Sequence, residues 1–192
     1  MYKINKGVLI MELHFYTDGS AHKPIKGSYG GYGITIFDDN KTLIGCCCQQ
    51  FSTKVTNNQM ELMAILRTFE IKNEYHKNEP ITIYSDSAYC INALSSWIYT
   101  WCNNDWKNSQ NKIIENYNIF KSLYSYYNKE FFISQIEFKK ILGHSGIIGN
   151  ELSDALAQGN GKKFEQTILK NRVKLDPSLQ IFEKNENFCY TI

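Results

Sequence analysis

Apolar and polar positions in the first third of the chain follow a pattern typical of β-strands. Residues 13–20 combine aliphatic and aromatic side chains with Thr, and residues 29–37 and 41–51 repeat this character. Turn residues at 38–40 separate the last two segments, and residues 21–28, with two lysines and a proline, predict a loop between the first two. We therefore expect an antiparallel meander of three strands.

The pattern becomes helical after residue 55. Thr56 stands three residues before Gln59, which is the spacing of a helix N-terminal capping box. The helix predicted over residues 60–69 is apolar on nearly every side, which indicates a buried helix. Glu61 lies in its first turns, where an unpaired charge removed from water would be costly.

The middle of the chain alternates strands and helices. A short apolar run at 81–86 ends in Asp86, residues 87–94 read as a helix, and residues 133–142 predict a fifth strand. Parallel strands joined by helices bind ligands at their carboxyl ends. Asp86 is predicted at such an end, and so is Asp18, although the Asp-Gly pair that Asp18 forms with Gly19 is also common turn chemistry.

Residues 97–127 are rich in aromatic residues and Asn. Trp97, Trp101 and Trp106 stand at roughly helical spacing, which fits either packing inside a helical hairpin or a platform for stacking on nucleotides. A Gly-rich loop with His144 follows the fifth strand and leads into a helix that carries Asp154.

Length and composition indicate one domain with extensions. The 192 residues are 43% hydrophobic and 14% aromatic, which is enough for a core. The net charge of +2 does not predict a polyanion partner for the whole surface. No apolar run suits a membrane span or a signal peptide, and the six cysteines show neither zinc nor disulfide spacing, so we expect a cytoplasmic protein with reduced thiols.

Four acidic positions are candidates for one site. They are Asp18, Glu61, Asp86 and Asp154. Carboxylates brought together repel unless cations neutralise them, and oxygen-only ligands favour Mg²⁺ or Mn²⁺ over zinc. Two such ions about 3.5 to 4 Å apart can activate water and stabilise the leaving oxygen of a displacement at phosphorus. From the residues alone this convergence is a hypothesis.

The motifs together resemble those of type 1 ribonuclease H, the ribonuclease HI group. The resemblance runs in order and spacing from residue 13 to residue 157. It rests on Thr-Asp-Gly-Ser at 17–20, Thr-Asn-Asn-Gln-Met-Glu at 56–61, Ser-Asp-Ser at 85–87, Gly-His-Ser-Gly at 143–146 and Asn-Glu-Leu-Ser-Asp at 150–154.

This resemblance implies an α/β, ribonuclease H-like fold: a five-stranded mixed sheet with helices on both faces. It implies endonucleolytic hydrolysis of the RNA strand of RNA/DNA hybrids with two Mg²⁺ ions, leaving 3′-hydroxyl and 5′-phosphate ends, with Mn²⁺ as a substitute. The alternatives are a hybrid-binding module without catalysis and a related nuclease of the same fold. We expect a monomer that has an RNA/DNA hybrid as its partner and makes no membrane contact.

The resemblance also assigns roles to individual residues. The metal-binding carboxylates would be Asp18, Glu61, Asp86 and Asp154, and the loop histidine that assists proton transfer or product departure would be His144. The expected nucleic-acid contacts are Thr56, Asn57, Asn58, Trp97, Trp101, Trp106 and Asn150.

Two segments depart from the family pattern. The loop after Ser20 is longer than the compact form common in bacterial enzymes, and the handle after Trp106 carries few cations, which predicts modest affinity for hybrids.

We divide the chain into an N-terminal extension at 1–11, a catalytic domain at 12–158 and a C-terminal extension at 159–192. The extension, with Phe164 and Ile168 one helical turn apart, is expected either to pack back on the domain as a solvated helix or to bind nucleic acid.

Overall fold

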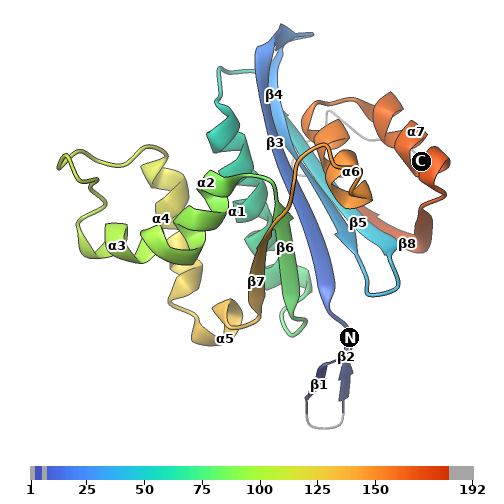
Figure 1. Cartoon of the computed structure of the whole chain (residues 1–192), viewed down its shortest axis with the longest axis horizontal. Helices are drawn as coiled ribbons and strands as arrows, with labels where there is room; N and C mark the ends of the chain where they lie inside the picture. Colours follow the sequence, from blue (N-terminus) through green and yellow to red (C-terminus); the bar gives the residue numbers. More distant parts are fainter. Residues whose placement is uncertain (1–2, 6–7, 182–192) are drawn as a thin grey trace.

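The computed structural model describes residues 3–5 and 8–181, and its centre is a six-stranded mixed sheet (Figure 1). The strands lie in the order β7-β6-β3-β4-β5-β8. Their bounds are β3 Leu13–Ile25, β4 Ser28–Phe37, β5 Thr42–Phe51, β6 Ile81–Ser85, β7 Ile136–Lys140 and β8 Lys174–Ile181. A separate two-stranded ribbon, β1 Lys3–Asn5 and β2 Val8–Ile10, precedes the sheet.

The predicted meander is present: β3 pairs antiparallel with β4, and β4 pairs antiparallel with β5. Strands β6 and β7 extend the sheet parallel to β3. The loop predicted over residues 21–28 is wrong for most of its length, because β3 continues to Ile25 and β4 begins at Ser28. Only Lys26 and Gly27 connect them. The resulting hairpin projects beyond the rest of the sheet (Figure 1).

Helix α1, Asn57–Tyr75, covers one face of the sheet against β3 and β4. Thr56 and Gln59 form the predicted capping box, in which each side chain binds the other residue's backbone amide. The helix is buried over much of its circumference, as its apolar sequence predicts. Its start therefore lies fixed against the sheet, which matters for Glu61.

A helical subdomain follows β6 on the same side (Figure 1). It contains α2 Ala88–Asn92, the π-helical turn η1 Ala93–Trp97, α3 Ile98–Asn103, α4 Tyr117–Tyr127 and α5 Glu130–Ile133. Aromatic side chains of α4, including the fully buried Phe120, join the core formed by α1 and the sheet. The subdomain is therefore packed on the main core through its aromatic residues.

The opposite face of the sheet carries α6, Ile148–Ala157, and α7, Gly161–Asn171 (Figure 1). Phe164 and Ile168 of α7 are 1% and 8% exposed and pack with residues of β4, β5 and α6, so the prediction of a C-terminal helix that packs back is confirmed. The five-strand prediction is wrong by one: β8 pairs parallel with β5, because the tail returns to the sheet edge after α7.

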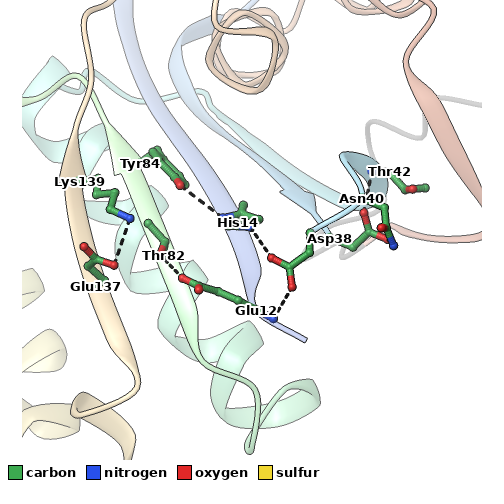
Figure 2. Close-up of polar contacts among 10 residues, drawn as sticks. Glu12, His14, Asp38, Asn40, Thr42, Thr82, Tyr84, Glu137 and Lys139 are labelled. Carbon is green, nitrogen blue, oxygen red and sulfur yellow. Dashed lines mark hydrogen bonds and ion pairs between the residues drawn. The ribbon is translucent and has the colours of Figure 1, made fainter. Parts of the chain in front are cut away.

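A chain of polar contacts crosses β3 and β6 near the start of β3 (Figure 2). His14 lies between Asp39, in the β4–β5 turn, and Tyr84. Its Nε2 is 3.1 Å from Asp39 Oδ1, and its Nδ1 is 3.3 Å from the Tyr84 hydroxyl. The Thr82 hydroxyl donates to the Glu12 carboxylate, and the Glu12 amide donates to Asp39. These contacts tie the entry of β3 to its neighbours, and therefore help to fix the strand that carries Asp18.

Among the residues that the structure describes, no helix has the length and apolar character required to cross a bilayer. Among the described residues, Cys46, Cys47, Cys48, Cys90 and Cys102 form no disulfide, and Cys189 lies outside that part of the chain.

Candidate metal centre

Asp18 lies in β3 just beyond the point where pairing with β6 ends, while pairing with β4 continues. The strand pairs with β6 only as far as Tyr16, whereas its pairing with β4 continues through Asp18, opposite Gly33, to Ala21. Gly19 and Ser20 stay in the strand, so the alternative interpretation of the Asp18-Gly19 pair as a turn is wrong. Asp18 is instead held by a continuous ladder, and its carboxylate accepts a hydrogen bond of 2.7 Å from the Gly19 amide.

Gly19 brings Glu61 to the sheet. A β-carbon added at Gly19 would lie 2.2 Å from the backbone nitrogen of Glu61, well inside van der Waals contact. Only a residue without a side chain lets the first turn of α1 approach the strand this closely. The Glu61 carboxylate consequently lies beside Asp18 although the two residues come from different elements.

Asp86 follows β6 directly, as predicted, and stands before the N-cap residue of α2, Ser87. A β-carbon added at Gly143, in the loop after β7, would lie 2.3 Å from the Asp86 carboxylate. The glycine therefore leaves the space that the Asp86 side chain occupies. The parallel strands β6 and β7 thus deliver this carboxylate to the same edge of the sheet as Asp18.

Asp18, Glu61 and Asp86 form a compact oxygen cluster. One carboxylate oxygen from each lies within 4.8 Å of the other two. Asp18 and Glu61 are each only 7% exposed. Neither they nor Asp86 forms an ion pair with a Lys, Arg or His within the described part of the chain. Three acidic groups thus share a small space without a protein cation.

The pKa values of the cluster reflect this crowding. Burial, with the charges of Asp86 and Asp154, raises the pKa of Asp18 to about 7. Burial and the neighbouring aspartates also raise the pKa of Glu61 well above its ordinary value. Glu61 Oε2 is buried and has no hydrogen-bond partner among the described residues. A cluster of carboxylate oxygens that has no protein cation among the described residues, and that includes a buried oxygen without a hydrogen-bond partner there, fits a hard divalent cation.

Asp154 lies outside this compact group, although its charge still acts on Asp18. The residue is 5% exposed, and its carboxylate is bound by two side chains: Lys163 Nζ lies 2.6 Å from Oδ2 and Gln158 Nε2 lies 2.6 Å from Oδ1. Helix α6 reaches the sheet at Gly33, where an added β-carbon would lie 2.1 Å from the Ser153 carbonyl oxygen. Since Gly33 pairs with Asp18, this contact brings Asp154 to the same region.

The expected substrate contacts at the start of α1 lie on the surface. Thr56, Asn57 and Asn58 are all exposed. Thr56 is engaged in its capping box, and Asn57 Oδ1 accepts a hydrogen bond of 2.7 Å from the Ala21 amide. Asn57 therefore connects α1 to the projecting part of β3, next to the carboxylates.

His144 and Asn150 occupy contrasting environments. His144 is exposed in the loop between β7 and α6, with a left-handed backbone at φ 51°. Asn150 is only 1% exposed, and its amide nitrogen and oxygen have no hydrogen-bond partner among the described residues. The buried position of Asn150 does not favour the direct nucleic-acid contact expected from the sequence, which remains a prediction.

The three tryptophans differ in exposure. Trp97 is 40% exposed, whereas Trp101 and Trp106 are partly buried against the core. Trp101 packs edge to face with Trp97 and with Phe120, at centroid distances of 5.8 and 5.0 Å. Of the two interpretations left open, packing describes Trp101 and Trp106, and Trp97 retains a surface for stacking.

Sequence reasoning missed Lys163, Gln158 and the two packing glycines. Gln158 follows Asp154 by four residues, a spacing that places both on one helix face, so this contact had a local signal. The Lys163 contact had none, because it depends on how α7 folds back on α6. In the sequence, Gly19 suggested a turn and Gly33 close packing in a strand. Only the structure shows that α1 packs on Gly19 and α6 on Gly33.

Comparisons with known proteins agree with this geometry. The sequence model of the RNase H family matches residues 11–161. Ribonuclease H of Orientia tsutsugamushi is 33% identical over 157 residues, covering 81% of this chain and 85% of that protein. Ribonuclease H of Caldicellulosiruptor saccharolyticus is 32% identical over 148 residues, covering 77% of this chain and 94% of that protein.

Solved structures show the same fold at lower identity. LC9-RNase H1, described as a type 1 RNase H with the type 2 active-site motif, is 18% identical with a TM-score of 0.64, covering 88% of this chain and 89% of that one. The foamy viral protease-reverse transcriptase in complex with RNA/DNA hybrid is 21% identical with a TM-score of 0.66, covering 77% of this chain and 20% of that one. By the extent of the family-model match and the identity to the two ribonuclease H sequences above, the chain belongs to the RNase H family.

Proposed function

We propose that this protein is an endoribonuclease that hydrolyses the RNA strand of RNA/DNA hybrids and leaves 3′-hydroxyl and 5′-phosphate ends. The observation that carries the proposal is the cluster of Asp18, Glu61 and Asp86, whose oxygens lie within 4.8 Å of one another in a chain of the RNase H family. Such a cluster, held by three separate elements, suits catalysis by bound cations.

Asp18, Glu61 and Asp86 would hold Mg²⁺, with Asp154 as a fourth ligand and Mn²⁺ as a substitute. When bound, two ions would supply activation of the attacking water and neutralisation of charge at the phosphate. The protein's part is to keep the carboxylates in place. The β3 ladder holds Asp18, the close approach at Gly19 holds Glu61, and the end of β6 holds Asp86.

Charge balance explains why these residues would take up a cation readily. Without one, the raised pKa values of Asp18 and Glu61 favour a proton on the pair near neutral pH. A divalent cation would displace that proton and remove the mutual repulsion of the carboxylates. The energy stored in the crowded acidic groups therefore favours metal binding.

His144 would move a proton between the site and solvent. His144 is exposed and directly follows Gly143, which borders the space of the Asp86 side chain, and an imidazole can both accept and donate a proton there.

The hybrid would lie across the start of α1 and the helical subdomain. Asn57 and Asn58 are exposed beside the carboxylates, where amide groups can read the 2′-hydroxyls of a minor groove, and Thr56 can bind a phosphate. Trp97 offers an exposed aromatic surface in the helical subdomain. We propose that a monomer makes all of these contacts.

The test is a cleavage assay with labelled RNA/DNA hybrid, duplex RNA and duplex DNA in the presence of Mg²⁺. The wild-type protein should cut only the RNA strand of the hybrid, and Asp18→Asn should lower the rate by at least about a thousandfold while leaving the fold intact. Cleavage of duplex DNA would instead indicate a different nuclease of this fold. Hybrid binding without cleavage would indicate a binding module.

A further inference from the structure

Lys163 occupies a fixed position next to the carboxylate site. It lies in the first turn of α7, where its backbone amide donates a hydrogen bond of 3.0 Å to the side chain of the N-cap residue Asn160. The next residue, Phe164, is buried and anchors α7 in the core that it shares with α6. The base of the Lys163 side chain is therefore held by both the helix start and the core.

The Lys163 ammonium is the counter-ion of Asp154. Nζ lies 2.6 Å from Oδ2, and the side chain of Lys163 is 35% exposed against 7% for Asp154. Gln158 binds the other carboxylate oxygen, so both oxygens of Asp154 have donors from the chain. The other three acidic residues have no such partner within the part of the chain that the structure describes.

We infer that Lys163 competes with a divalent cation for Asp154 and lowers the affinity of the second cation site. This inference rests on the proposed function, because it assumes that Asp154 is a metal ligand. The Lys163 ammonium, 2.6 Å from Oδ2, occupies one of the acceptor positions of that oxygen, and its positive charge repels a cation bound beside it. Cation binding at Asp154 is therefore favoured when Lys163 moves away, and the partial exposure of its side chain gives the ammonium a path into water.

The competition makes the two halves of the site unequal. Asp18, Glu61 and Asp86 are not neutralised by the protein and should bind the first cation tightly. The charge of Asp154 is already balanced by Lys163, so binding of the second cation there is less favourable. The second ion should therefore bind at higher metal concentration than the first, and Lys163 should set part of that difference.

The experiment is a calorimetric titration of the full chain with Mn²⁺, without nucleic acid. Lys163→Met removes the charge and keeps most of the stem, Lys163→Arg keeps the charge, and Lys162→Met is the matched control, since Lys162 is an exposed neighbour on the same helix. Lys163→Met should tighten the weaker Mn²⁺ site by about two- to tenfold, as expected for a partly exposed ion pair. Lys163→Arg and Lys162→Met should stay within about twofold of wild type.

A second comparison uses the Asp154→Asn background, in which Lys163→Met should no longer change Mn²⁺ affinity. The inference is overturned if Lys163→Met leaves the weaker site unchanged or weakens it, or if Lys162→Met tightens it equally. Asp18→Asn separates this inference from the proposed function. Loss of Mn²⁺ binding in Asp18→Asn with no effect of Lys163→Met overturns only the role of Lys163. Undiminished binding in Asp18→Asn overturns the metal centre itself.

Discussion

Gly19 of β3 lies directly beneath the backbone nitrogen of Glu61, at a distance that leaves no space for a β-carbon. The strand that carries one proposed ligand thus sets the position of the helix that carries another. Gly19→Ala should displace the first turn of α1, lowering stability by about 1 to 3 kcal/mol, as overpacking does. The cleavage rate of the folded variant should fall by about a hundredfold, because the Glu61 carboxylate would shift.

Urea unfolding and single-turnover cleavage of a labelled hybrid measure the two effects. Ser20→Ala is the matched control: successive strand residues face opposite sides, so it does not face α1. Its stability should stay within about 0.5 kcal/mol of wild type. A fully stable, fully active Gly19→Ala protein would show that α1 can move without disturbing Glu61.

The stability of the metal-free protein should fall as pH rises. The folded chain holds the Asp18 carboxyl at a pKa of about 7, against 3.8 ordinarily, so between these values the folded state binds a proton that the unfolded state has released. The destabilisation begins above the ordinary pKa and is complete above about pH 7. Asp18→Asn should therefore stabilise the metal-free protein by about 1 to 3 kcal/mol more at pH 8 than at pH 4.

Chemical unfolding of both proteins in the presence of a chelator, across this pH range, checks the prediction. Added Mg²⁺ should reduce the advantage of Asp18→Asn at pH 8, because the cation replaces the missing proton in the wild-type protein. An advantage that is the same at both pH values would mean that Asp18 titrates normally in the folded chain.

Lys72 should contribute strongly to stability. Its fully buried side chain donates to the His76 and Glu79 carbonyl oxygens at 3.2 and 2.7 Å and to Gln135 Oε1 at 2.8 Å. Burial lowers its pKa to about 8. Lys72→Met would leave these acceptors without a donor at the junction of α1, β6 and β7, and should cost about 2 to 4 kcal/mol.

Urea midpoints and slopes measure this loss. Lys77→Met is the control, since Lys77 is exposed in the segment that connects α1 to β6, and its change should lie within about 0.5 kcal/mol. If the two substitutions cost the same, the three hydrogen bonds of Lys72 add nothing beyond the loss of a charge.

Hybrid binding should depend weakly on salt. The handle offers Lys107, Lys112 and Lys121, and its acidic residues Asp105 and Glu115 offset two of these charges. Each phosphate contact contributes about 0.9 to the slope of log affinity against log salt on duplex DNA. With Asp18→Asn to prevent cleavage, the combined change of Lys112 and Lys121 to Gln should lower that slope by no more than about 2.

Fluorescence anisotropy with a labelled hybrid between low and moderate salt gives the slope. A family member with a densely basic handle is the reference. A slope as steep as that reference would contradict the prediction and would point to other cations, such as those of the projecting β3–β4 hairpin or α7.

The sequence predicted the elements better than their lengths. The capping box at Thr56 fixed the start of α1, because capping is a local interaction between residues three apart. The predicted end of β3 at residue 20 was wrong, because an Asp-Gly pair is compatible with both a turn and a strand. Only pairing with β4 decides between them. The sixth strand was missed for a similar reason, since residues 174–181 carry little apolar alternation and gain their structure from the edge of β5.

The candidate site was predictable as a set of residues but not as an arrangement. Family motifs named all four acidic positions, and the structure gathers Asp18, Glu61 and Asp86. Asp154 differs from the other three because its carboxylate is paired with Lys163, nine residues further along the chain. That pairing requires α7 to fold back on α6. Contacts of this kind arise from tertiary packing, for which a single sequence carries no periodic signal.

The pairing of β8 with β5 also bears on how readily a second chain could add a strand to the sheet. Without β8, the edge of β5 would expose a row of backbone donors and acceptors that a second chain could extend. The replacement edge is a poor template: β8 contains Pro177, which has no amide hydrogen, and its register shifts between the pairs at Leu43 and Gly45. The far edge, β7, carries the charges of Glu137, Lys139 and Lys140. The sheet is thus guarded at both sides against strand addition, and a variant that releases β8 should aggregate from that side first.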